Sequence, residues 1–273
     1  MRVLTIAALT AITSMAAPAF AQEADAFSGP YVGGSVGYGF QRNNAGDRQR
    51  FDRGFNGSFD TITTTTGANA FSPGFCGGAA QGAAPVNGCE DDKDDIEYHV
   101  RAGWDLQYGD YVIGVVGEFG KSEISDSVSS FSTTPASYTM TREIDWEANL
   151  RARAGYLVDD LTLAYATAGA AYAKIDNSFA TTNTVNAFQD NGSSDSWGFA
   201  VGTGIERSMG AFSIGLEYLY TRYTEDDYRV RAIAGNAVAS NPFILNGQPG
   251  TEFSRADEEF DRHALRVTAA LRF

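Results

Sequence analysis

Few side chains in this 273-residue chain have the types and spacing that a catalytic or metal site requires. His99 and His263 are the only histidines, and neither has a serine nucleophile and an acid grouped with it, as nucleophilic catalysis needs. The spacing of the acidic runs matches no EF-hand calcium loop. The sequence therefore predicts no catalytic residues, no cofactor and no metal site. These acidic runs are Glu90–Asp95, Glu225–Asp227 and Asp257–Glu259.

Most of the remaining charged residues follow a strict alternation that is clearest between Glu143 and Leu157. Alternation of this kind predicts a β-strand with one apolar and one polar face. The segment is longer than the about 5–6 residues of a typical soluble strand and suits the roughly 9–11 of a tilted membrane-spanning strand. The apolar parity is Ile144, Trp146, Ala148, Leu150, Ala152, Ala154 and Tyr156, and the polar parity is Glu143, Asp145, Glu147, Asn149, Arg151, Arg153 and Gly155.

Eight segments show this pattern, and three tight turns alternate with four long loops between them. The pattern predicts an all-β fold: an eight-stranded antiparallel up-and-down transmembrane β-barrel with short periplasmic turns and long extracellular loops. Residues 122–142, 176–194 and 224–260 are expected to be loops, and residues 41–94 leave open whether a loop there contains extra strands. The expected strands are residues 30–40, 95–108, 111–121, 143–157, 161–175, 195–207, 211–223 and 261–273.

The polar parity of these strands collects acids and bases that we expect to form a polar network in the lumen. Folding the hairpins about their turns places Arg101 opposite Glu118 and Lys174 opposite Asp145, and turns Tyr165 toward lipid. The expected network is Glu97, His99, Arg101, Asp105, Glu118, Asp145, Glu147, Arg151, Arg153, Lys174, Glu206, Glu217, Arg262, Arg266 and Arg272.

Two interpretations of this lumen stay open. Eight strands leave an interior just wide enough for side chains to fill, and buried charges must be paired, which favours a plugged lumen. The alternative is a narrow path for water or ions. A soluble lipocalin-type barrel would share the alternation with its apolar face inward, but aromatic residues near the strand ends favour the membrane.

The first residues have the features of an export signal. Arg2 is followed by an apolar run and by Ala19-Phe20-Ala21, a small-x-small cleavage pattern, so we expect a signal peptide over residues 1–21 and a barrel domain over residues 22–273. In an exported chain the closely spaced Cys76 and Cys89 predict a disulfide, with metal binding as the weaker alternative. A formal net charge of -14 argues against nucleic acid as a partner.

Several segments together carry a family resemblance. The chain resembles the outer-membrane protein β-barrel domain family of small surface antigens and opacity-type, porin-like barrels, which are similar to the transmembrane half of OmpA. The resemblance implies residence in the outer membrane of a Gram-negative cell, and a last strand that the barrel-assembly machinery recognises. The segments are Phe27–Gly34, Trp146–Tyr156, Tyr165–Gly169, Gly215–Tyr220 and Arg266–Phe273, and the implied assembly signal is Leu265, Val267, Ala269, Leu271 and Phe273.

These observations predict a surface protein with a structural role in the envelope or an adhesin-like or antigen-like role in contacts with other surfaces. The alternative function is a narrow passive channel. A lipid A-modifying enzyme is the third hypothesis, because His263 lies near the outer end of its strand. Expected partners are outer-membrane lipid and lipopolysaccharide, the assembly machinery during biogenesis, and an extracellular ligand of the loops.

Overall fold

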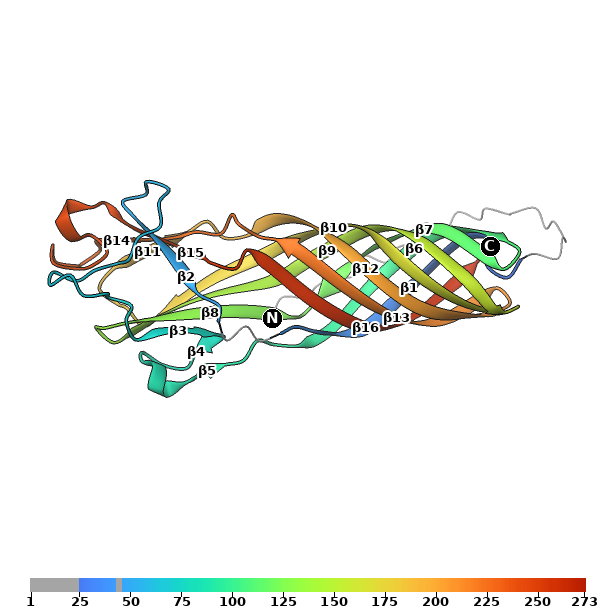
Figure 1. Cartoon of the computed structure of the whole chain (residues 1–273), viewed down its shortest axis with the longest axis horizontal. Helices are drawn as coiled ribbons and strands as arrows, with labels where there is room; N and C mark the ends of the chain where they lie inside the picture. Colours follow the sequence, from blue (N-terminus) through green and yellow to red (C-terminus); the bar gives the residue numbers. More distant parts are fainter. Residues whose placement is uncertain (1–24, 43–45) are drawn as a thin grey trace, which may run out of the picture.

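The computed structural model describes residues 25–42 and 46–273, so the expected signal peptide lies outside the described residues. Eight strands form a closed antiparallel barrel in which each pairs with the next and the last pairs with the first (Figure 1). The predicted fold class is confirmed. The barrel strands are β1 (Gly29–Phe40), β6 (Asp95–Tyr108), β7 (Tyr111–Ser122), β9 (Ala136–Asp159), β10 (Thr162–Thr181), β12 (Ser194–Met209), β13 (Phe212–Thr224) and β16 (Glu259–Arg272).

The two faces of the barrel wall are inverted relative to a soluble protein. On β9, Leu150 is 65% exposed while the neighbouring Arg151 is fully buried. The same contrast recurs on β13, where Leu216 is 53% exposed and Glu217 is 1% exposed. A wall with apolar side chains outside and charged side chains inside has the arrangement of a barrel in lipid.

The two ends of the barrel differ. Three short turns and both ends of the barrel chain lie at one end, where the amide of Phe273 donates to the carbonyl of Pro30. Gly109 opens the first of these turns with a positive φ of 60°, which a hairpin turn with Gly first requires. The four long connections lie at the other end. In the described residues no helix is both long and apolar enough for a membrane span.

The predicted orientation of the fifth strand, β10, is wrong. Irregularities in the β9–β10 pairing occur between Thr162 and Leu163 and again beside Lys174. Lys174 therefore pairs with Trp146 rather than with Asp145. Because each extra residue reverses the side-chain alternation, folding the hairpin about a regular turn put Tyr165 outside, whereas it is buried in the lumen.

Strands also occur in the segments that we expected to be loops. β9 and β10 continue past the barrel, where β8 (Ser125–Ser132) pairs with β9. The expectation of loops at residues 122–142, 176–194 and 224–260 is therefore corrected, because cross-strand packing orders short polar strands with little alternation. The further strands are β2 (Gln49–Arg53), β3 (Gly74–Gly77), β4 (Ala79–Ala80), β5 (Cys89–Glu90), β11 (Ala187–Asp190), β14 (Val230–Ile233) and β15 (Gly250–Arg255), with short 3₁₀ helices η1 (Pro85–Asn87) and η2 (Leu245–Gly247).

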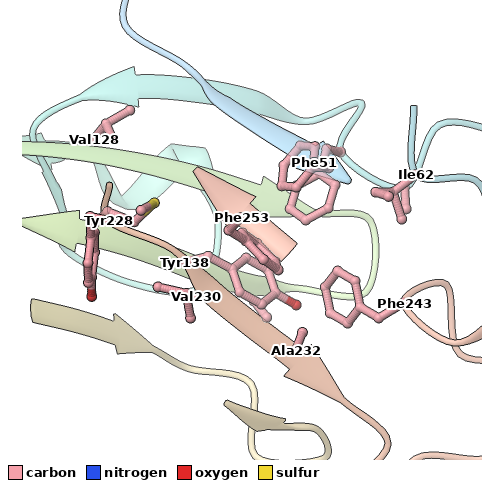
Figure 2. Packing of buried hydrophobic residues seen from close by; sticks show 13 residues of the cluster. Phe51, Ile62, Val128, Tyr138, Tyr228, Val230, Ala232, Phe243 and Phe253 are labelled. Atoms are coloured by element: carbon pink, nitrogen blue, oxygen red, sulfur yellow. The ribbon is translucent and has the colours of Figure 1, made fainter. Parts of the chain in front are cut away.

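These added strands form a structured region beyond the barrel. β11, β14, β15 and β2 make a second, four-stranded sheet, and β3 extends the β8–β9 pairing of the barrel sheet. An aromatic cluster lies between them (Figure 2). Phe51 stacks on Phe71 with ring centroids 4.2 Å apart, and it meets Phe253 edge-on at 5.0 Å. The long connections thus share a hydrophobic core of their own.

A disulfide joins Cys76 at β3 to Cys89 at β5. It closes the segment that contains the β4–β5 pair. The Ser129 hydroxyl on β8 donates to the carbonyl of Gly78 at 2.8 Å and accepts from the amide of Ala80 at 2.9 Å. The disulfide therefore closes this segment on itself, and strand pairing with β3 and the Ser129 hydrogen bonds attach the segment to β8.

Candidate functional site

The barrel lumen contains six arginines and six carboxylates that are almost fully buried. No side chain of the twelve is more than 6% exposed. Their formal charges sum to zero, and each arginine lies within ion-pair distance of at least one carboxylate. They are Arg101, Arg151, Arg153, Arg262, Arg266, Arg272, Glu97, Asp105, Glu118, Glu147, Glu206 and Glu217.

The first layer, nearest the short turns, is a square of two cations and two anions. Arg153 reaches Asp105 at 3.2 Å and Glu206 at 2.5 Å, and Arg272 reaches the same two carboxylates at 2.9 and 2.8 Å. The guanidinium of Arg153 also lies over the Tyr165 ring, 4.0 Å from its centroid. Each of the two guanidinium groups is therefore held by both carboxylates and by the face of an aromatic ring, Tyr165 for Arg153 and Tyr31 for Arg272.

A second layer crosses the middle of the lumen. Arg151 contacts Glu118 at 2.7 Å and Glu217 at 3.2 Å, and Arg266 contacts Glu118 at 3.0 Å. The Tyr165 hydroxyl donates to Glu217 at 3.0 Å. Arginines from a neighbouring strand and from a strand across the barrel thus contact the same carboxylate.

The third layer lies toward the long connections. Arg262 pairs with both Glu97 and Glu147, and the Tyr223 hydroxyl donates to Glu147. His99 Nε2 lies 2.6 Å from the Glu147 carboxylate, and its side chain is fully buried. The histidine belongs to this network, and no solvent-filled cleft leads to it among the described cavities.

An apolar layer covers the charged layers at the long-connection end. Ile124, Ile144 and Phe260 are at most 1% exposed there. The lumen is therefore occupied by side chains in successive layers, the interior expected for a barrel of eight strands. Moving an ion along it would require separating buried pairs, and a buried charge that loses its partner is costly.

Beyond the apolar layer lies an outer ion cluster. Arg255 contacts Asp47 at 2.6 Å and Asp126 at 2.8 Å, and Arg142 contacts Asp126 at 2.6 Å. Asp92 accepts from the amide of Ser127 at 2.8 Å beside this cluster. Burial, together with the Asp126 and Asp47 carboxylates, raises the pKa of Asp92 to about 6.

Two residues of the expected lumen network lie outside it. Asp145 is exposed, because the irregularity beside Trp146 turns it outward. Lys174 is only half-buried and belongs to the outward parity of β10, whose inward neighbours Ala173 and Ile175 are buried. The two errors arise at opposite ends of the hairpin: the irregularity beside Trp146 turns Asp145 outward, and the irregularity between Thr162 and Leu163 sets the parity that turns Lys174 outward. The other thirteen expected residues line the lumen.

Sequence reasoning missed several polar residues of the interior. Tyr223 shares the parity of Glu217, so the alternation of its strand contained the signal. Tyr165 was hidden by the irregular start of β10. Arg142 and Arg255 lie in segments that we expected to be loops, and no local pattern there indicated burial.

Aromatic side chains form a continuous row on the outer face near the long-connection end. Ring centroids are 5.6 Å apart for Phe119 and Trp146, 5.4 Å for Trp146 and Tyr172, and 5.0 Å for Tyr172 and Trp197. These four residues come from four neighbouring strands. Such a girdle marks the level at which a barrel leaves the hydrocarbon core.

His263 extends this row. Its ring lies 5.4 Å from Phe40 and 5.1 Å from Tyr220, and its Nδ1 lies 2.6 Å from the Tyr218 hydroxyl. The partners of His263 are therefore aromatic and phenolic. Among the described residues, no serine hydroxyl and no carboxylate lies within hydrogen-bonding distance of this ring.

The last strand places its apolar side chains outward. Leu265, Val267, Leu271 and Phe273 are between 44% and 69% exposed, and Ala269 lies between them on the same face. Their common orientation is compatible with the implied assembly signal, which stays a prediction.

The family follows from comparison with known sequences. Residues 7–240 match the outer membrane protein beta-barrel domain. The chain belongs to this family. Together with the inverted faces of the barrel wall, membership confirms the predicted location in the outer membrane, and the short turns of barrels in this membrane face the periplasm.

Curated relatives include the 31 kDa outer-membrane immunogenic proteins of Brucella melitensis and Brucella suis. Each is 29% identical over 125 residues, which are 45% of this chain and 51% of the relative. The chain thus matches about half the length of these relatives.

Similar solved structures include OprG of Pseudomonas aeruginosa, with 10% identity and a TM-score of 0.47 over 90% of this chain and 98% of OprG. The outer membrane protease OmpT of Escherichia coli has 8% identity and a TM-score of 0.41 over 90% of this chain and 97% of OmpT.

Proposed function

We propose that this family member is a closed, non-conducting outer-membrane anchor that displays a folded extracellular region for contact with another surface. The observation that carries the proposal is the charge-neutral lumen, in which six arginines and six carboxylates pair in layers beneath an apolar layer. A path for solute would have to cross all of these layers.

The extracellular region supports the display part of the proposal. Its connections share a buried aromatic core, and the disulfide between Cys76 and Cys89 fixes one of them. A surface that is ordered before it meets a partner loses less entropy on binding. Its partners in this proposal are lipopolysaccharide around the rim and an external ligand at the loops, and the barrel-assembly machinery inserts it.

The proposal also makes the protein non-enzymatic. His99 is held in the buried network by Glu147, and His263 contacts Tyr218 and aromatic rings. Neither histidine has the nucleophile–base–acid geometry of hydrolytic catalysis.

Planar-bilayer recording of the purified, refolded protein tests the closed lumen. We expect no conductance steps from the wild-type protein, with insertion verified by heat-modifiable gel mobility of the same preparation. Steady unitary steps would instead support the passive channel.

A further inference from the structure

A pocket of about 350 Å³ lies at the far extracellular end, where all four long connections meet. The segment at residues 70–71 comes from the β1–β6 connection, and the β8–β9 turn around Thr134 comes from the β7–β9 connection. Residues 182–185 and 241–243 come from the other two. One pocket thus depends on the correct folding of every loop.

The floor of the pocket is aromatic. Phe71, Tyr138 and Phe243 surround it, with ring centroids 5.5 to 6.0 Å apart. Figure 2 shows Tyr138 and Phe243 next to each other in the core of the extracellular region. These three residues are only 2–3% exposed, so small edges of their rings, together with the neighbouring Pro242, form the apolar base of the pocket.

The rim of the pocket is uncharged and mostly polar, with Val185, 47% exposed, and Pro135 as its apolar members. Threonine hydroxyls, including those of Thr134, Thr182 and Thr184, and the amide of Asn183 surround the opening. None of the described residues that line the pocket is charged, although 20% of the chain is Asp, Glu, Lys or Arg. This neutrality stands out on a chain with a net charge of -14.

The rim is also held in place from within. The Asn183 amide donates to the Tyr138 hydroxyl at 3.0 Å, and the Asn241 amide donates to Asn186 at 3.0 Å. These bonds connect three of the four connections beneath the opening. The pocket is therefore formed before a ligand arrives, as is usual for small-molecule sites.

The lining selects the class of ligand. A charged ligand would lose water without meeting a counter-ion, which is unfavourable. A purely apolar group would cover rim hydroxyls and leave them without water partners. A sugar ring has an apolar C–H face for the floor and neutral hydroxyls for the rim, and the volume lies at the lower end of the about 300–1,000 Å³ typical of ligand pockets.

We propose that this pocket binds a neutral sugar residue of a surface glycan. The proposal rests on the proposed surface-contact function and names its ligand class. It assigns recognition to the four loops acting together, with the barrel as the support that holds them.

The test is a glycan array probed with the full-length protein in nanodiscs, followed by calorimetric titration with any neutral oligosaccharide retained. Thr134→Trp fills the pocket from its exposed rim. Thr65→Trp, at an exposed threonine of the β1–β6 connection outside the pocket, is the matched control. We expect wild type and T65W to retain the same neutral glycans, with affinities within twofold, and T134W to bind them at least tenfold more weakly.

The comparison is valid only if T134W is folded. We therefore require T134W to show the same heat-modifiable gel mobility as the wild type. If it does not, Thr184→Trp on the opposite part of the rim replaces it. Equal binding by T134W and wild type, or retention of no neutral glycan, would overturn the sugar proposal. Retention of sulfated or sialylated glycans alone, unaffected by T134W, would also overturn it while leaving the surface-contact function standing.

Discussion

At the scale of single residues, Arg262 illustrates how the lumen is stabilised. Its guanidinium pairs with Glu97 and Glu147, and all three side chains are at most 2% exposed. Removing water from such charges costs several kcal/mol per ion, and this cost is offset only while the partners remain. The contribution of each residue therefore depends on its neighbours.

We expect Arg262→Ala to destabilise the barrel by about 3–5 kcal/mol, because buried Glu147 loses its arginine partner and buried Glu97 keeps only Arg266. Urea unfolding in lipid vesicles measures the change. Arg207→Ala is the control, since Arg207 pairs with Asp159 at 3.3 Å on the surface, with both side chains more than half exposed, and such pairs contribute about 0–1 kcal/mol. Equal effects of the two substitutions would contradict the role of the lumen network.

Asp92 gives the outer ion cluster a pH dependence. Its pKa is about 6 in the folded protein, against an ordinary value of 3.8, so the folded state holds the proton more tightly than the unfolded chain. Protonation therefore stabilises the region as pH falls from about 6 toward 4, and this contribution is lost as pH rises through 6. The Arg255 cation and the Asp47 and Asp126 carboxylates act on the group, and Arg142 pairs with Asp126 beside it.

Asp92→Asn keeps an acceptor for the Ser127 amide and removes the titration. We expect the amides of β8 to be more protected in the wild type at pH 5 than at pH 7.5, and equally protected at both in the variant. Hydrogen exchange, corrected for intrinsic rates, measures this. An unchanged pH dependence in the variant would assign the titration to another group.

The alternation of residue types predicted most of the lumen network from the sequence. Arg262 and Glu147 were found because each lies on the polar parity of a regular strand. Asp145 was misplaced by the irregularity beside Trp146 and Lys174 by the irregularity between Thr162 and Leu163, and neither leaves a mark in the hydropathy pattern. Irregularities of this kind are settled by packing between strands, which one strand's sequence does not contain.

At the scale of elements, β8, β9 and β10 unite the barrel with the extracellular region. Tyr138 lies on the extended part of β9, is 2% exposed, and contacts rings from other connections. The eight barrel strands could be predicted because lipid imposes one apolar face along their length. The short strands above them could not, since their order comes from contacts between loops distant in sequence.

We expect Tyr138→Ala to destabilise the extracellular region by about 3–5 kcal/mol, the usual cost of removing a buried aromatic ring, while the barrel stays folded. Hydrogen exchange should increase in β11, β14 and β15 and remain slow in β12 and β13. Tyr138→Phe keeps the ring and loses only the bonds of its hydroxyl, so we expect a loss of about 1 kcal/mol. Faster exchange throughout the barrel would show that the two parts do not unfold separately.

At the scale of the whole molecule, the different lengths of the connections at the two ends of the barrel determine its expected orientation in the membrane. The connections that carry the aromatic core are expected outside the cell, and the short turns are expected in the periplasm. The family membership and the outward apolar faces agree on the membrane.

Labelling of single introduced cysteines with a membrane-impermeant maleimide on intact cells tests this orientation. We expect Thr65→Cys to be labelled, and Asp160→Cys, at a short turn, to be labelled only after the outer membrane is permeabilised. Labelling of Asp160→Cys on intact cells would reverse the topology. The same protein with a lipid-accessible spin label at Leu216 should be relaxed by oxygen more than by a polar nickel reagent, because that side chain faces the acyl chains.

The length of β9 determines how far the extracellular region extends above the membrane. Trp146 lies at the aromatic girdle, and the strand continues from Asp145 back to Ala136. A strand rises about 3.4 Å per residue, so these ten residues span up to ~34 Å. The turn at the top therefore extends well beyond the aromatic girdle, on the side of the barrel that is expected to face away from the cell.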